Sequence, residues 1–121
     1  MKSIFIASSR KFQTEVNALI KKLIQSQIKV FTAGKWNKSQ KDTPQSEKKA
    51  LITAFKTIDN SDILYIYAKK GYIGKTVAME IAYAYSKNKT IISSEKIDEL
   101  SAQALVHKII SHDELMKYCK N

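Results

Sequence analysis

The stretch DILYIYAKKGYIGKTVAMEIAYAYSKNKTIIS, residues 62–93, contains a strand-like run, a turn with two glycines, a helical stripe and a second strand-like run. The first run, residues 62–68, is apolar at consecutive positions after Asp62, which is typical of a strand covered on both faces in a parallel sheet. The helical stripe consists of Val77, Ile81, Ala84 and Tyr85. With a second strand at residues 90–93, this order predicts a right-handed βαβ crossover.

The same alternation extends on both sides of this stretch. Further strand candidates lie at residues 4–7, 28–31 and 109–110. Two more helices have apolar stripes, which consist of Phe12, Val16, Leu19, Ile20 and Leu23 in one and of Leu51, Ala54, Phe55 and Ile58 in the other. We therefore predict one α/β domain over residues 1–121, a small doubly wound, flavodoxin- or Rossmann-like parallel sheet of about five strands flanked by helices.

Pro44 and the residues before it mark a connection in this pattern. Proline is tolerated near a helix start because its missing N–H is not needed there, so Pro44 predicts the start of the second helix. The polar residues 32–43, which include Gly34 and Trp36, are predicted to form a loop.

The net charge of +10 comes from lysines dispersed along the chain and from one arginine, Arg10. Dispersed lysine is typical of a solubilising surface, and the sequence has neither an RNA-recognition pattern nor a helix-turn-helix pattern. We therefore do not expect a nucleic-acid partner, although a basic RNA-associated accessory protein stays open as an alternative.

The single cysteine, Cys119, cannot form an internal disulfide, which favours a reducing compartment. The N-terminal residues lack the features of a signal peptide, and no run reaches the ~20 apolar residues of a membrane span. We expect a cytoplasmic protein with no membrane partner.

No cluster has metal-ligand spacing, His107 and His112 are expected to be exposed or to cap helices, and no cofactor is expected.

A doubly wound fold binds ligands beyond the carboxyl ends of its strands, where the chain order reverses. The first loop at this edge contains Ala7, Ser8, Ser9 and Arg10. Small residues let a ligand approach the backbone, the hydroxyl groups offer hydrogen bonds, and the guanidinium suits a phosphate. A serine that only caps the following helix is the structural alternative.

The second loop at this edge contains Tyr72, Gly74, Lys75 and Thr76. Gly74-Lys75-Thr76 matches the end of a phosphate-binding P-loop, but the glycine that this pattern needs at position 69 is a lysine, which excludes such an ATPase. What remains is either an anion site or a structural turn. Tyr72 offers a ring that could stack on a base.

Three elements in order, Ser61-Asp62, Glu80-Ile-Ala-Tyr-Ala and Asn88-Lys-Thr-Ile, follow an opening strand and loop at residues 4–9. This arrangement resembles the nucleoside 2-deoxyribosyltransferase family, including the deoxynucleoside 5′-monophosphate N-hydrolases, and it covers the chain up to Ser94. It looks closest to the branch that carries a Gly-Tyr-Ile-Gly loop.

The resemblance implies that Glu80 is the catalytic glutamate, which attacks the anomeric carbon of a deoxyribosyl group and displaces the base. Without the resemblance, Glu80 would be interpreted as an acidic residue in a first helical turn that favours the helix dipole. The resemblance also places Ser8, Ser9 and Arg10 around the sugar or its phosphate, with residues 74–76 beside them.

The chain departs from the family after the third strand, where the transferases have an aspartate and this sequence has Ala68-Lys69-Lys70. The general acid is therefore missing, and the lysines favour a nucleoside 5′-monophosphate substrate and hydrolysis over transfer. A non-catalytic nucleotide-binding or sensing module on the same fold is the alternative. Family members form homo-oligomers, and Met79, Tyr83 and Tyr85 make a dimer plausible here.

Overall fold

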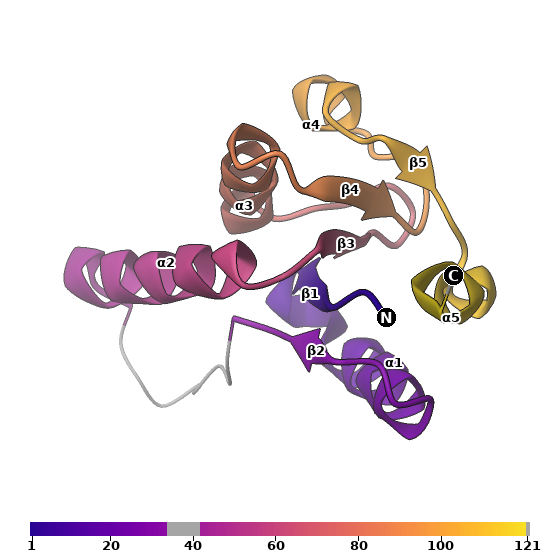
Figure 1. The fold of residues 1–121 in the computed structure, drawn as a ribbon. Helices are drawn as coiled ribbons and strands as arrows, with labels where there is room; N and C mark the ends of the chain where they lie inside the picture. Colours follow the sequence, from indigo (N-terminus) through magenta and orange to yellow (C-terminus); the bar gives the residue numbers. More distant parts are fainter. Residues whose placement is uncertain (34–41, 121) are drawn as a thin grey trace.

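The computed structural model describes residues 1–33 and 42–120, and it contains one sheet of five parallel strands in the order β2-β1-β3-β4-β5 (Figure 1). The strands are β1 (Ile4–Ser8), β2 (Val30–Phe31), β3 (Ile63–Tyr67), β4 (Thr90–Ser93) and β5 (Lys108–Ile109). The α/β class and the parallel sheet are confirmed. The flavodoxin-like order means that chain order reverses between β1 and β3, where such folds place their ligands.

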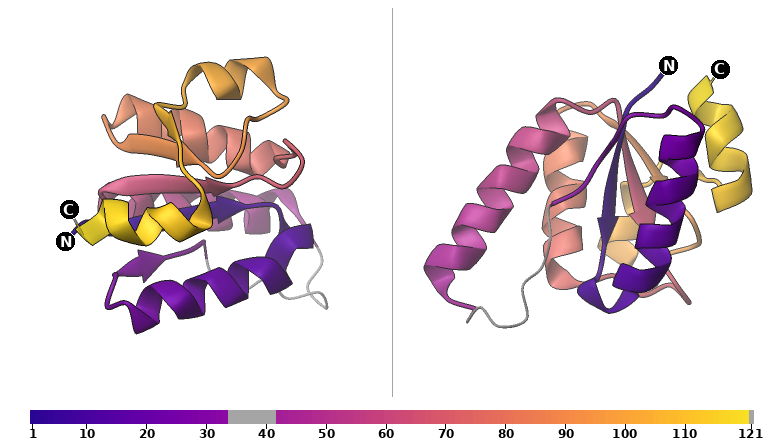
Figure 2. Two further views of the ribbon diagram at one scale, coloured as in Figure 1. Left: turned by 90° about the vertical axis from the view of Figure 1, so that its right-hand side faces the viewer. Right: turned by 90° about the horizontal axis from the view of Figure 1, so that it is seen from below.

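Helices cover both faces of the sheet. They are the short 3₁₀ helix η1 (Arg10–Phe12), α1 (Gln13–Gln25), α2 (Pro44–Asp59), α3 (Lys75–Ser86), α4 (Leu100–Ala104) and α5 (His112–Lys120). Figures 1 and 2 show α1 and α5 on one side of the sheet and α2, α3 and α4 on the other. None of the helices in the described part of the chain is long and apolar enough to cross a membrane.

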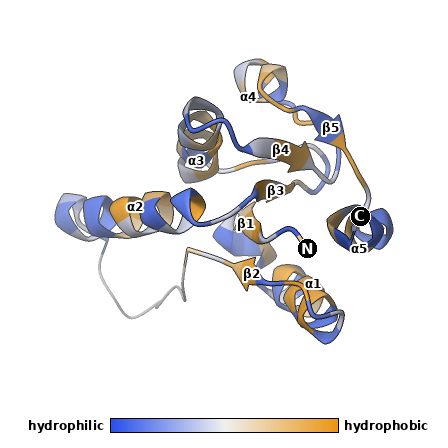
Figure 3. Ribbon diagram, viewed as in Figure 1, coloured by the Kyte–Doolittle hydropathy of each residue, from blue (hydrophilic) through white to orange (hydrophobic). Residues whose placement is uncertain are grey.

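Each face of the sheet has its own hydrophobic core. Phe5, Leu64 and Ile66 pack against α2 and α3, whereas Ile4 and Tyr65 pack against α1 and α5. Because successive side chains of a strand point to opposite faces, a strand covered on both faces must be apolar throughout. The apolar sides of the helices in Figure 3 accordingly turn toward the sheet.

The amino edge of the sheet is closed by polar contacts near the chain ends. The Asp62 carboxylate accepts a hydrogen bond of 2.8 Å from the backbone N–H of Ser3, and this bond is the main reason why the pKa of Asp62 lies below its usual value. The backbone N–H of Lys2 donates to the carbonyl of Cys119 at 3.2 Å. Asp62 therefore lies at the edge opposite the carboxyl ends of β1 and β3.

Some details differ from the sequence predictions, and the second strand is Val30–Phe31 where residues 28–31 were expected. The fifth strand is Lys108–Ile109, one residue earlier than expected. Tyr85 does not belong to the buried stripe of α3: it is 49% exposed and its ring stacks on that of His107. Most of the loop predicted at residues 32–43, including Gly34 and Trp36, lies outside the described residues.

Candidate active site

A cleft of about 580 Å³ opens at the carboxyl ends of β1 and β2, where Ala7 and Ser8 of β1 and Thr32 and Ala33 after β2 line it. The loop after β1, the start of α3 and the N-terminal half of α2 form its walls. Of the residues predicted from sequence, the cleft brings together all except Tyr72, namely Ala7, Ser8, Ser9, Arg10, Gly74, Lys75, Thr76 and Glu80. Its volume falls in the range that holds a small organic ligand.

Glu80 lines this cleft from α3, and its side chain is nearly inaccessible to solvent. The residue is 3% exposed, and within residues 1–33 and 42–120 its carboxyl group has no hydrogen-bond partner. Burial penalises the charged form and raises the pKa of Glu80 from 4.5 to about 7. Near neutral pH this group is therefore available in both its protonated and its ionised form, which suits either a nucleophile or an acid.

The position of Glu80 in α3 differs from the first-turn position expected on helix-dipole grounds. Since α3 begins at Lys75, Glu80 lies in the second turn, on the same face as the buried Val77, Ile81 and Ala84. These four positions have the i, i+3, i+4, i+7 spacing of an apolar face. An acidic residue in the middle of an otherwise apolar helix face is therefore the feature of the sequence that indicates a functional carboxylate.

The loop after β1 contributes backbone and hydroxyl groups to the cleft. Ser8 ends β1, and Ser9 follows it as the N-cap of η1, where its Oγ accepts a hydrogen bond of 3.4 Å from the Lys11 N–H. Ser9 thus has the structural capping role that was the alternative at the sequence level. Both serines also line the cleft, so neither role excludes the other.

The opposite wall begins at Gly74, the N-cap residue of α3, which makes no side-chain capping bond. Lys75 and Thr76 form the first turn, and the exposed N–H groups of a helix start favour negative charge. A Cβ added at Gly74 would lie 3.9 Å from Cβ of Ser9. The loop after β1 and the start of α3 therefore lie against each other at the wall of the cleft.

Tyr72 lies in a neighbouring groove of about 370 Å³. Its ring packs edge-on against Phe12, and Lys11 Nζ lies 3.5 Å from the ring centre. Lys69 and Lys70 line the same groove. The two lysines that replace the family aspartate therefore do not line the cleft of Glu80, and among the described residues the cations that do are Arg10, Lys49 and Lys75.

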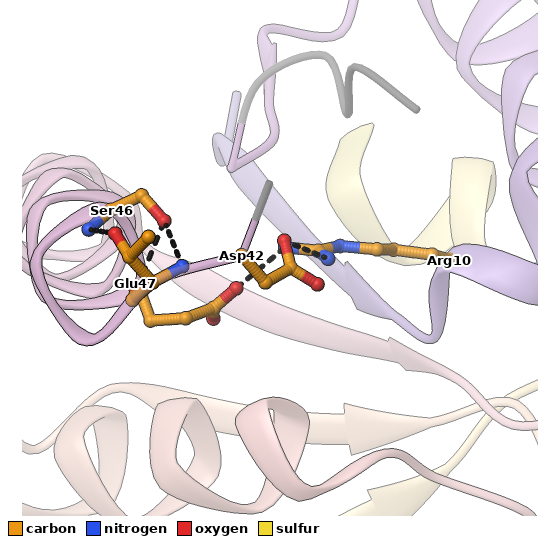
Figure 4. Close-up of polar contacts among 5 residues, drawn as sticks. Arg10, Asp42, Ser46 and Glu47 are labelled. Atoms are coloured by element: carbon orange, nitrogen blue, oxygen red, sulfur yellow. Dashed lines mark hydrogen bonds and ion pairs between the residues drawn. The ribbon is translucent and has the colours of Figure 1, made fainter. Parts of the chain in front are cut away.

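Arg10 lines the cleft and pairs with two carboxylates that the sequence analysis did not single out. Its guanidinium lies 3.7 Å from Asp42 Oδ1 and 3.5 Å from Glu47 Oε1 (Figure 4). Glu47 is held in place because α2 starts with a capping box, in which Thr43 and Ser46 exchange side-chain-to-backbone hydrogen bonds. Pro44 predicted this helix start, but nothing in the local sequence indicated that the helix would meet Arg10.

The histidines lie elsewhere. The hydroxyl of Tyr65 donates to the Ile110 carbonyl, so it accepts from Nδ1–H of His112 at 2.9 Å, and the His112 ring stacks on Tyr67. His107 Nδ1 accepts from the Ile91 N–H. Across the described ranges, no three His, Cys, Asp or Glu side chains are grouped so that they could hold a metal ion.

We compared the sequence and the structure with those of known proteins. No family model matches the sequence, and a search of curated proteins found no match. Solved structures are similar over nearly the whole chain. A 2-deoxyribosyltransferase from Bacillus psychrosaccharolyticus has a TM-score of 0.72 and 16% identity, with 96% of this chain and 91% of the other covered.

Two further structures agree with it. The CMP N-glycosidase BcmB of Clostridium botulinum gives a TM-score of 0.60 at 19% identity, with 98% of each chain covered. A conserved protein from Enterococcus faecalis V583 gives 0.63 at 16% identity, with 99% of this chain and 98% of the other covered. The chain shares the fold of these proteins. The resemblance inferred from sequence is thus confirmed at the level of the fold.

Proposed function

We propose that this chain binds a nucleoside or nucleotide in the cleft and cleaves its N-glycosidic bond, with Glu80 as the nucleophile. One observation carries the proposal: a buried glutamate, whose carboxyl group has no hydrogen-bond partner among the described residues, lines a ligand-sized cleft between the carboxyl end of β1 and the start of α3. The shared fold with a 2-deoxyribosyltransferase and a CMP N-glycosidase supports this class of chemistry.

The chemistry requires the ionised form of Glu80. Its carboxylate attacks C1′ while the bond between C1′ and the base nitrogen breaks, the bonding electrons leave with the base, and the base takes up a proton. Negative charge beneath C1′ stabilises the oxocarbenium-like transition state. Attack by water on the resulting glycosyl ester then gives the free sugar and restores Glu80, whereas attack by a second base gives transfer.

A nucleoside 5′-monophosphate and hydrolysis are the substrate and reaction that we favour. Arg10, Lys49 and Lys75 line the cleft, and the N-terminus of α3 also favours an anion. Ser8, Ser9 and Thr76 supply hydroxyl groups that position the sugar or its phosphate.

A non-catalytic nucleotide-binding module is the second candidate. The observation that favours it is the absence of an acid after β3, where Ala68 is buried and Lys69 lies 3.6 Å from Glu15 outside the cleft. Such a module would bind the same ligands without releasing a base.

The experiment that separates these candidates measures free base. The protein is incubated with deoxynucleoside and ribonucleoside 5′-monophosphates and with the matching nucleosides, and base release is followed by chromatography. We expect release from a deoxynucleotide and a loss of at least about 100-fold in Glu80→Gln, since covalent catalysis needs the carboxylate. Glu114→Gln, which removes an exposed carboxylate of α5, should keep full activity. Equal activity in Glu80→Gln and the parent would overturn the assignment.

The assembly that we propose is a cytoplasmic homodimer formed through α3. Met79 is 52% exposed on this helix. Tyr83 contributes less than the sequence suggested, because its ring stacks on Phe55 and its hydroxyl donates to Asp59. Met79 is therefore the apolar side chain of α3 that we expect to be covered by a second copy.

A further inference from the structure

The guanidinium of Arg10 is already engaged by two carboxylates at the wall of the cleft. The distances of 3.5 and 3.7 Å, to Glu47 and Asp42, are longer than those of tight charge-assisted hydrogen bonds. The side chains of Arg10 and Glu47 are 44% and 42% exposed, and that of Asp42 is 64% exposed. Such pairs are weak, so another anion can exchange with either carboxylate.

A phosphate in the cleft would meet the same guanidinium. Arginine binds phosphate through two N–H groups side by side, and both terminal nitrogens of Arg10 face carboxylates here. The two carboxylates beside this guanidinium also place negative charge at this part of the wall. A phosphate must therefore displace Glu47 or Asp42 and overcome their repulsion, whereas an uncharged sugar hydroxyl does not.

We propose that Glu47 is a specificity-determining residue. Its carboxylate competes with the 5′-phosphate of the ligand for Arg10 and so lowers the affinity for a nucleotide relative to that for the matching nucleoside. This inference rests on the proposed function, because it assumes that the cleft takes the sugar and phosphate of a nucleotide. It goes beyond that function because it assigns control of the affinity for phosphate to Glu47 on α2, whereas Glu80 lies on α3.

The test compares affinities for a nucleotide and its nucleoside. Glu47→Gln keeps the length and hydrogen-bonding shape of the side chain but removes its charge. Binding of each deoxynucleoside 5′-monophosphate and the matching deoxynucleoside is measured by calorimetry in the Glu80→Gln background, which keeps the ligand intact. The ratio of the two affinities is the readout, because a merely structural role of Glu47 would change both ligands alike.

We expect Glu47→Gln to raise affinity for the monophosphate about threefold at low salt and to leave the nucleoside within error, as befits one exposed ion pair. The gain should shrink as salt screens the charges. In an Arg10→Gln background the effect of Glu47→Gln should fall to about zero, because the two residues then have nothing to exchange.

The matched control is Glu114→Gln. Glu114 lies in the first turn of α5 as Glu47 lies in the first turn of α2, so both changes remove one negative charge and one favourable dipole interaction. An equal gain in both variants would show a long-range charge effect and overturn the inference, as would an unchanged ratio in Glu47→Gln. If nucleotides bind but no base is ever released, the proposed enzyme fails while the ratio still decides the role of Glu47. If neither ligand binds at millimolar concentration, both proposals fail.

Discussion

Glu80 is a residue whose burial lowers stability but favours the proposed catalysis. Glu80 lies on the buried face of α3, and no described residue gives its carboxyl group a hydrogen bond that would favour the charged form. Unpaired charge is costly to bury, so the folded protein favours the protonated group and the pKa rises to about 7. The lack of water and hydrogen bonds that makes the charged form of Glu80 unfavourable also makes its carboxylate reactive toward an electron-poor carbon.

The raised pKa of Glu80 predicts a loss of stability as pH rises. Below pH 4.5 both the folded and the unfolded chain hold the proton; between 4.5 and about 7 the unfolded chain releases it while the folded chain retains it. The unfolded state then binds fewer protons, so the free energy of unfolding falls by ~3 kcal/mol over this window and stays lower above it. Urea unfolding at several pH values measures this fall.

Glu80→Gln should remove this component of the pH dependence. Its stability relative to the parent should therefore increase from pH 4.5 to about 7, because glutamine carries no charge to bury. A difference between the two proteins that is constant with pH would contradict the assigned environment of Glu80.

The candidate site was predictable where topology alone decides it. Ser8 ends the first strand, Ser9 follows it, and Gly74 precedes the helix after the third strand, so a doubly wound fold places them together. The pairing of Arg10 with Glu47 joins residues 37 positions apart and depends on how α2 crosses the sheet. Tyr72 shows the reverse case, since a residue of the right loop turns to Phe12 and lines another groove.

At the scale of the elements, the connection from β3 to α3 depends on two glycines with different duties. Gly71 has φ of +82°, a left-handed conformation that favours glycine, and an added Cβ would lie 2.6 Å from Cγ of Asp98. The N–H of Asp98 also donates to the Gly71 carbonyl at 3.0 Å. Gly74 has φ of −82° and ordinary space around it.

Gly71→Ala and Gly74→Ala should therefore fail in different ways. We expect Gly71→Ala to lower the free energy of unfolding by about 1–2 kcal/mol, because alanine must adopt a left-handed conformation and displace Asp98. Gly74→Ala should change stability by less than about 0.5 kcal/mol but weaken ligand binding, because its methyl group would lie against Ser9 in the wall of the cleft. Urea unfolding and base release, measured on both variants, distinguish the two effects. Equal stability of the two variants would contradict this division.

The elements that could be predicted best were those with a strong, uniform pattern. The apolar run of β3 and the stripe of α1 contain enough residues to fix both type and position. β5 is two residues long with both residues exposed, so hydrophobicity could not locate its ends. Tyr85 was wrongly assigned to the buried face of α3 because it lies four residues after Ile81, whereas the buried face also includes Glu80 and ends at Ala84.

For the whole molecule, the surface left on α3 leads to a prediction about assembly. Met79→Lys should shift a homodimer toward monomer, since a charge would have to be buried between the copies. Sedimentation velocity at several concentrations measures the shift. Ile24→Lys is the matched control, because Ile24 is equally apolar, 58% exposed, and lies on α1 across the sheet. A parent that stays monomeric at all concentrations would contradict the dimer.

The contact between Lys2 and Cys119 has a practical consequence for handling the molecule. Both lie at the amino edge of the sheet, and the two ends appear together in Figure 2, whereas the cleft opens beyond the carboxyl ends of the strands. A resin, sensor surface or fused reporter attached through either end would therefore leave the cleft facing the bulk liquid. The same neighbourhood lets a short peptide join the ends into a ring without crossing the entrance.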